Sequence, residues 1–234
     1  MKPVVCVGAV NIDVMLHSDR FCEPDEEVHV NNIEVCSGGQ AGNIASALGK
    51  LGHKPYFLGH IGTDTYTQML KKNFEETNVE HSFALTSETP NNTAYCIIDK
   101  KGDRQLYTYD NTKISSEQFP GQLYSAEMIV FTSLAQEKAI EEYARIAKKA
   151  KERGVSIALV PSSLFTKKGF ETLKPLLKYT DYFIASEREI NELLANREFN
   201  ELKTLVPHIA ITHGKRGASL YSAEKKITGR SKRS

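Results

Sequence analysis

Two polar residues near the N-terminus combine chemistry and spacing suited to a small polyhydroxyl ligand. Asn11 and Asp13 are separated by one residue and follow the apolar run Val4–Val10. In an extended segment this spacing places both side chains on one face. An amide beside a carboxylate offers donors and acceptors for neighbouring hydroxyl groups. A turn or a helix cap uses the same residue types equally often, so the pair alone does not decide between a binding site and a structural role.

A glycine-rich stretch follows and opens a predicted helix. It reads Ser37-Gly38-Gly39-Gln40-Ala41-Gly42-Asn43. Glycines let a ligand approach the backbone closely, and free N–H groups at a helix start can bind an anion or a hydroxyl. The stretch lacks the glycine at position 37 that the dinucleotide fingerprint needs and the Lys-Ser/Thr end of a phosphate-binding loop. A Rossmann dehydrogenase is therefore disfavoured.

The rest of the chain alternates short apolar runs with segments of helical period. Six runs are predicted to be buried strands: Val4–Val10, Tyr56–Leu58, Met128–Phe131, Ile157–Val160, Tyr182–Ala185 and Ile209–Thr212. Four apolar helix faces are predicted: Ile44/Ala47/Leu48/Leu51, Tyr66/Met69/Leu70/Phe74, Ile140/Tyr143/Ala147/Ala150 and Phe170/Leu173/Leu177. This alternation predicts an α/β fold with a doubly wound, mostly parallel sheet flanked by helices.

Two segments interrupt the alternation. Residues 14–36 hold extended stretches around an acidic loop, and residues 93–110 are predicted to form a hairpin with a turn at Lys100–Asp103. Their alternation of apolar and polar residues is typical of a sheet with one solvent-exposed face. The pattern alone favours neither a small second sheet over a binding site nor a pair of surface hairpins.

Composition limits the classes of protein to consider. Charged residues make up 25% of the 234 residues and the formal net charge is +1, so no overall field favours nucleic acid or an anionic membrane. No apolar run is long enough to span a bilayer and no signal peptide is evident, so we expect a cytoplasmic protein. Cys6, Cys22, Cys36 and Cys96 have no metal-binding spacing, and we expect buried free thiols. The basic residues 225–234 are expected to form a frayed end.

Taken together, the N-terminal motifs resemble those of the ribokinase (PfkB) family of carbohydrate and nucleoside kinases. The matching residues are Val7–Asp13, Gly38–Ala45 and Gly59–Asp64. The resemblance implies sugar-binding roles for Asn11, Asp13, Gly38, Gly39 and Asn43. It also implies a lid formed by residues 14–36 and 93–110, on an α/β core of residues 1–13, 37–92 and 111–234. The lid is a candidate surface for a homodimer.

Two later motifs are similar to the nucleotide side of that family. Thr180–Glu189 resembles its Asn-x-x-Glu segment, which implies that Glu189 lies near magnesium and that position 186 contacts phosphate or magnesium. Ser186 departs from the usual Asn and reaches less far. Thr212–Gly217 is similar to a Thr-x-Gly-x-x-Gly turn, which implies nucleotide contacts from Thr212, Gly214, Lys215 and Gly217. Without the resemblance, residues 187–189 are typical of a charged first turn of a helix.

The resemblance implies ATP-dependent phosphoryl transfer, with magnesium, to a hydroxyl of a sugar or nucleoside. The family's Gly-Ala-Gly-Asp segment, which supplies the anion hole and the base, has no counterpart in this sequence. We therefore assign no catalytic residue and expect that segment beyond Ser234. A sugar-binding protein without catalysis and an inactive fragment remain as alternatives.

Overall fold

The computed structural model describes residues 2–222 and 225–229. The chain forms two compact units, one from Met1–Val7 and Lys113–Ser234 and the other from Gly8–Thr112. We call them the large-sheet unit and the N-terminal unit.

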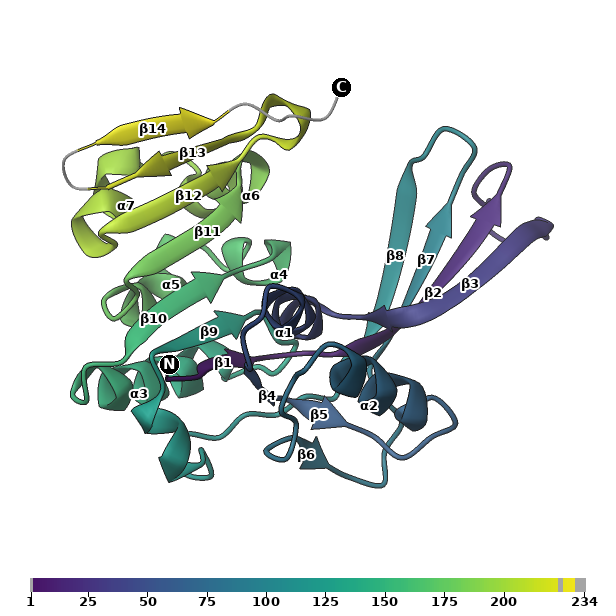
Figure 1. Cartoon of the computed structure of the whole chain (residues 1–234). Helices are drawn as coiled ribbons and strands as arrows, with labels where there is room; N and C mark the ends of the chain where they lie inside the picture. The colour runs from purple at the N-terminus through teal and green to yellow at the C-terminus, as the bar shows by residue number, and fades with distance from the viewer. Residues whose placement is uncertain (1, 223–224, 230–234) are drawn as a thin grey trace. The chain divides into compact units, whose positions relative to one another are not determined.

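The large-sheet unit contains a mostly parallel sheet with the strand order β14-β13-β12-β11-β10-β9-β1 (Figure 1). The strands are β1 (Val4–Val7), β9 (Met128–Thr132), β10 (Ser156–Val160), β11 (Tyr182–Ser186), β12 (His208–Thr212), β13 (Ala218–Tyr221) and β14 (Lys226–Gly229). Pairing is parallel from β1 to β12, and β13 and β14 join antiparallel. The predicted α/β fold with a mostly parallel sheet is confirmed.

Helices alternate with these strands along the chain. They are α3 (Ala139–Lys151), α4 (Ser163–Thr166), α5 (Phe170–Leu177), α6 (Glu187–Leu194) and α7 (Phe199–Leu205), with 3-10 turns η1 (Gly121–Ser125) and η2 (Gly214–Arg216). Both predicted faces are buried: Ile140, Tyr143, Ala147 and Ala150 on α3, and Phe170, Leu173 and Leu177 on α5. Tyr143 stacks on Phe131 of β9 with ring centroids 4.3 Å apart, so α3 packs its apolar face directly on the sheet.

The N-terminal unit is built around a four-stranded sheet of order β3-β2-β7-β8. Its strands are β2 (Asn11–Ser18), β3 (Val30–Gly38), β7 (Thr93–Ile98) and β8 (Arg104–Tyr109). The unit also contains α1 (Gln40–Lys50), α2 (Thr67–Glu76), β4 (Tyr56–Leu58), β5 (His60–Ile61) and β6 (Leu85–Thr86). The two segments that interrupt the alternation therefore pair with each other through β2 and β7, which run parallel.

The two faces of this small sheet differ in character. One face, here called the Asp13 face, carries the paired row Cys36, Asp13, Ala94 and Thr108. The other, here called the apolar face, carries the row Val35, Val14, Tyr95 and Tyr107 and the neighbouring Ile33 and Leu16. Ile33 and Tyr107 are each 61% exposed, so much of the apolar face is in contact with solvent.

Five sequence expectations are wrong. The predicted face Tyr66/Met69/Leu70/Phe74 is buried only in part, because Tyr66 precedes α2 and is 41% exposed whereas Leu70 and Phe74 are fully buried. The run Tyr182–Ala185 is a strand with only one buried side, because Tyr182 and Ile184 are each 37% exposed. The buried face of α1 consists of Ala41, Gly42, Ala45 and Gly49, whereas Leu51 is 77% exposed and Ala47 is exposed. Small residues line that face because a Cβ on Gly49 would lie 1.6 Å from the carbonyl oxygen of Thr77. Lys226–Gly229 forms the edge strand β14 instead of a frayed end, and residues 223–224 and 230–234 lie outside the described part. The cysteines are free as expected, but Cys22 and Cys36 are exposed.

Candidate functional site

Asn11 and Asp13 lie on β2 and point to the same face of the four-stranded sheet, as their spacing predicts. In the antiparallel pairing with β3, Asn11 stands opposite Gly38 and Asp13 opposite Cys36. The Oδ1 atoms of both side chains are buried and accept no hydrogen bond from any described residue. Buried polar atoms in proteins are nearly always paired, so two unpaired acceptors side by side indicate a place for the donors of a ligand.

Gly38 and Gly39 shape the space around these acceptors. A Cβ on Gly38 would lie 2.0 Å from Oδ2 of Asp13, so no larger residue fits without moving the carboxylate. Gly39 has φ of +80°, and a Cβ there would lie 2.7 Å from the carbonyl oxygen of Ala9. The Asp13 side chain therefore limits the space at Gly38, whereas the backbone of residues 9–11 and a conformation that favours glycine explain Gly39.

The start of α1 is less open than expected. The N–H groups of Ala41 and Gly42 both donate to the carbonyl oxygen of Ala9, and that of Asn43 donates to Gly39. The anticipated row of free N–H groups is therefore mostly satisfied within the chain. The side chain of Asn43 is exposed on the first turn of α1, four residues after Gly39.

The environment of Asp13 changes its acidity. Burial raises the pKa of the Asp13 carboxyl above its ordinary value of 3.8, because a low-dielectric environment disfavours the charged form. Burial and the neighbouring Asp13 carboxylate also raise the pKa of the Cys36 thiol.

The predicted nucleotide residues meet in the large-sheet unit. Ser186 ends β11 and Thr212 ends β12, and the two are direct partners in the parallel pairing. Both stand at the carboxyl ends of their strands, where ligands bind in open α/β sheets. Gly214 and Gly217 in the following turn have φ of 58° and 103°, which explains glycine at both positions. Lys215 between them is exposed.

An ion pair and a neighbouring histidine contact join this turn to the start of α6. The Glu187 carboxylate contacts the Arg216 guanidinium, and its Oε2 lies 3.6 Å from Nδ1 of His213. The Ser186–Glu189 end of one motif and the Thr212–Gly217 turn of the other are therefore held side by side within this unit.

Glu189 is engaged in a capping box with Ser186. The Ser186 hydroxyl accepts the Glu189 N–H at 3.3 Å, and Oε2 of Glu189 accepts the Ser186 N–H at 2.7 Å. The Ser186 hydroxyl also lies 2.8 Å from that Oε2. A charged first turn, the alternative that the residues alone favoured, thus describes what these side chains do locally.

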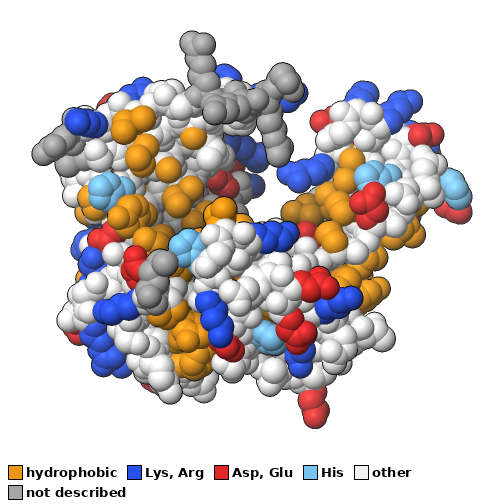
Figure 2. All heavy atoms as spheres, in the orientation of Figure 1, with side chains coloured by type: hydrophobic (Ala, Val, Ile, Leu, Met, Phe, Trp, Pro, Cys, Tyr) orange, Lys and Arg blue, Asp and Glu red, His pale blue; other side chains and the backbone are white. Residues whose placement is uncertain are grey.

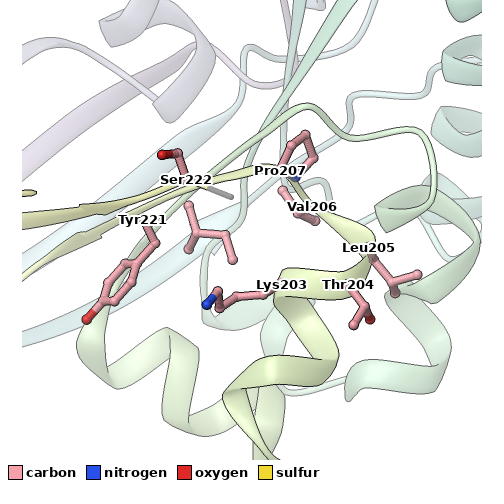
Figure 3. Close-up of a pocket in the computed structure, with 8 residues that line it drawn as sticks. Lys203, Thr204, Leu205, Val206, Pro207, Tyr221 and Ser222 are labelled. Carbon is pink, nitrogen blue, oxygen red and sulfur yellow. The ribbon is translucent and has the colours of Figure 1, made fainter. Parts of the chain in front are cut away.

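The pocket shown in Figure 3 does not coincide with the predicted nucleotide residues. Lys203, Val206, Pro207 and Tyr221 line it where α7 leads into β12. Thr212 stands at the opposite end of β12, so this pocket is separate from the Ser186–Thr212 pair.

Comparison with known proteins decides the family. The model of the family described as pfkB family carbohydrate kinase matches residues 1–231. The chain belongs to the pfkB family.

Two curated relatives place the chain within that family. A bifunctional ribokinase/ribose-5-phosphate isomerase A of Fructilactobacillus sanfranciscensis is 26% identical, with 93% of this chain and 42% of the relative covered. An ATP-dependent ribose-1-phosphate kinase of Halopiger xanaduensis is 25% identical, with 95% and 74% covered. The chain thus spans less than half of one relative and about three quarters of the other.

A solved pfkB-family structure shows the same fold. The ribokinase of Arabidopsis thaliana, complexed with ribose and ATP, superposes with a TM-score of 0.80 at 18% identity, with 98% of this chain and 78% of that chain covered. At this identity the likeness concerns the fold alone.

Two buried polar side chains were not identified from the sequence. Asn91 and Asn92 are fully buried just before β7, where the Pro90-Asn91-Asn92 stretch has the composition of a turn. Two adjacent asparagines at the start of a predicted hairpin are the only sequence signal, and that signal does not reveal burial.

Proposed function

We propose that this chain supplies the sugar-binding and nucleotide-binding parts of an ATP-dependent kinase that phosphorylates a hydroxyl of a sugar or sugar-like substrate. The observation that carries the proposal is the pair of buried, unpaired Oδ1 atoms of Asn11 and Asp13 beside Gly38. Ligand hydroxyls would donate to these oxygens, and Asn43 would add a contact from the first turn of α1.

The nucleotide would contact the large-sheet unit through Ser186, Thr212, Gly214, Lys215 and Gly217. Glycine backbone at 214 and 217 permits close approach of phosphate or ribose, and Lys215 adds positive charge. Catalysis of phosphoryl transfer depends mainly on positioning and charge stabilisation, so the role assigned to these residues is to orient the nucleotide.

Magnesium, when bound with ATP, neutralises charge on the phosphates. Glu189 fits a contact to such an ion through Oε1, because Oε2 is occupied by the capping box. In the part of the chain that the structure describes, no group of three or more His, Cys, Asp or Glu could hold a metal. The ion would therefore be held mainly by phosphate oxygens and water, as is usual for magnesium.

Sugar binding without phosphoryl transfer is the second candidate. It is favoured by the capping box, which gives Glu189 a structural role that requires no metal. Sugar-dependent ADP release, compared with an active ribokinase as the positive control, separates this candidate from the kinase.

The lid assignment and the homodimer stay predictions, and the small sheet has a surface that suits them. Ile33, Tyr95 and Tyr107 expose a contiguous apolar face, and Asp13 lies on the opposite face. A second copy bound there would cover apolar surface while leaving the Asp13 face open to substrate. A cytoplasmic location also stays a prediction. No helix of residues 2–222 and 225–229 has the length and apolar character required to cross a membrane.

The test is calorimetric titration of the chain with ribose and other pentoses, hexoses and nucleosides, with and without nucleotide. Asp13→Ala removes a buried charged acceptor and should weaken binding of the best ligand by about 2–3 kcal/mol. Asp103→Asn, in the exposed β7–β8 turn, is the control and should bind like the wild type. An unchanged dissociation constant for Asp13→Ala would show that Asn11 and Asp13 are structural.

A further inference from the structure

Asn92 is a fully buried side chain at which three segments of the N-terminal unit meet. Its Nδ2 donates to the carbonyl oxygen of Val10 at 3.2 Å and to Oγ1 of Thr112 at 2.8 Å. Its Oδ1 accepts the N–H of Asn111 at 2.7 Å. Both N–H donors and the carbonyl acceptor of the amide are therefore used.

The backbone of Asn92 completes the arrangement. Its carbonyl oxygen accepts the N–H of Ile12 at 2.7 Å. The Val10 carbonyl and the Ile12 N–H belong to the two peptide planes that flank Asn11. One residue therefore anchors both peptide planes of Asn11, and these planes set the direction in which its side chain leaves the strand.

Asparagine suits position 92 because its side chain can donate two hydrogen bonds and accept one. Asp at that position would keep the acceptor for Asn111 and lose both donors, and Ser would be too short to reach two partners. Since the site is fully buried, a Val10 carbonyl left without its donor has no solvent to replace it.

We propose that Asn92 is a positioning residue for the sugar site, which holds Asn11 in its binding orientation through the backbone of Val10 and Ile12. The proposal rests on the sugar-binding role of Asn11 proposed above. Asn92 touches no substrate in this scheme and acts only through Asn11.

Asn91 provides a matched control. It is equally buried, and its side chain accepts the N–H of Gly62 at 2.8 Å and donates to Oδ1 of Asp64 at 2.6 Å and Oγ1 of Thr67 at 3.0 Å. None of these partners flanks Asn11. Substitution of Asn91 therefore removes buried side-chain hydrogen bonds, as substitution of Asn92 does, but none of the bonds of Asn91 reaches the residues next to Asn11.

The experiment compares Asn92→Ala and Asn91→Ala with the wild type by ¹⁵N NMR and by calorimetry with ribose and the sugar panel. Asn92→Asp serves as a second variant in case the alanine variant fails to fold, because aspartate has nearly the same shape as asparagine. In the Asn92 variants we expect shifted side-chain and backbone amide resonances of Asn11 and faster hydrogen exchange at Ile12. We also expect a sugar dissociation constant raised about tenfold or more. In Asn91→Ala we expect thermal stability to fall and the Asn11 resonances to keep their wild-type positions. The sugar dissociation constant of this variant should stay within about twofold of the wild-type value.

Two results would overturn the positioning role. One is unchanged Asn11 resonances in the Asn92 variants, and the other is an equal loss of affinity in Asn91→Ala and Asn92→Ala. If the wild type binds none of the sugars while the Asn11 resonances shift only in the Asn92 variants, the orientation of Asn11 by Asn92 is supported and the proposed sugar-binding function fails.

Discussion

Asp13 is a residue whose ionisation should oppose folding. Burial raises the pKa of its carboxyl, so the folded chain binds this proton more tightly than the unfolded chain does. Stability then falls as the pH rises from 3.8 through the folded pKa, and the deficit persists at neutral pH. A buried carboxylate that lowers stability in this way is expected at a position where its charge serves ligand binding.

Asp13→Asn should therefore raise the free energy of unfolding at neutral pH while it weakens sugar binding. Well below pH 3.8 both forms are uncharged and the difference in stability should vanish. Urea denaturation at neutral and at strongly acid pH measures this difference. Asp103→Asn, which removes an exposed charge, should show no gain, and a loss of stability in Asp13→Asn would contradict the burial argument.

Gly38 should tolerate no side chain if the Asp13 carboxylate binds the ligand. Gly38→Ala places a Cβ 2.0 Å from Oδ2 of Asp13 in the present geometry, so the carboxylate must move. We expect sugar affinity to fall about tenfold or more, since a displacement of about 1 Å can have larger effects. Gly121→Ala is the control, because nothing lies within 4 Å of a Cβ there. Equal affinities in both variants would argue that Asp13 does not contact the sugar.

The helix α6 depends on its capping box whether or not Glu189 binds an ion. Ser186→Ala removes the acceptor for the Glu189 N–H and should destabilise the protein by about 1 kcal/mol. Asn is also a favourable N-cap, so Ser186→Asn, which restores the residue usual in the family, should leave stability near the wild-type value. Thermal unfolding measures both changes, and a stable Ser186→Ala variant would show that the cap contributes little.

Glu189→Gln separates the capping role from the charge. Gln also serves in a capping box, so the melting temperature should change little. If Glu189 contacts magnesium, loss of its charge should weaken magnesium-dependent nucleotide binding while leaving magnesium-free binding unaltered. Calorimetry with ATP in the presence and absence of magnesium tests this, with Glu198→Gln at an exposed position as the control. Equal affinities for Glu189→Gln and the wild type would leave Glu189 with the capping role alone.

Each of the two units exposes an apolar sheet face. In the large-sheet unit, Ile184, Ala210, Leu220 and Ile227 form one cross-strand row from β11 to β14. Ile227 is 60% exposed, and hydrophobic side chains gather on the surface over these strands in Figure 2. With a formal net charge of only +1, little electrostatic repulsion opposes association. We therefore expect this chain to self-associate.

Single lysines on the two faces should distinguish a specific dimer from general association. Tyr107→Lys, on the apolar face of the small sheet, should lower the dimer fraction in sedimentation velocity. Leu220→Lys, in the β11–β14 row, should raise solubility and reduce larger species. Leu164→Lys replaces an exposed hydrophobic residue on α4, outside both of these sheet faces, and should change neither. If Tyr107→Lys sediments like the wild type at every concentration, the predicted dimer does not use that face.

The strands and the local motifs were predictable because their signals are local. Tyr56–Leu58 was predicted with the observed bounds, and Met128–Phe131 differs from β9 by one residue. Runs of β-branched and aromatic residues bounded by polar segments identify buried strands without knowledge of their neighbours. The Asn11/Asp13 spacing likewise set a common face, because side chains alternate along any strand.

Only the tertiary structure decided which polar atoms lack partners and which apolar faces stay exposed. Asn92 and Val10 are 82 residues apart, so the anchoring of Asn11 could not be found in any local window. The small-residue face of α1 follows from the close approach of Thr77, and the occupied oxygen of Glu189 follows from the conformation of Ser186 at the end of β11. Periodicity ranks residues by hydrophobicity, whereas burial and hydrogen-bond pairing depend on the distant segments that happen to approach, and those segments are known only once the chain has folded.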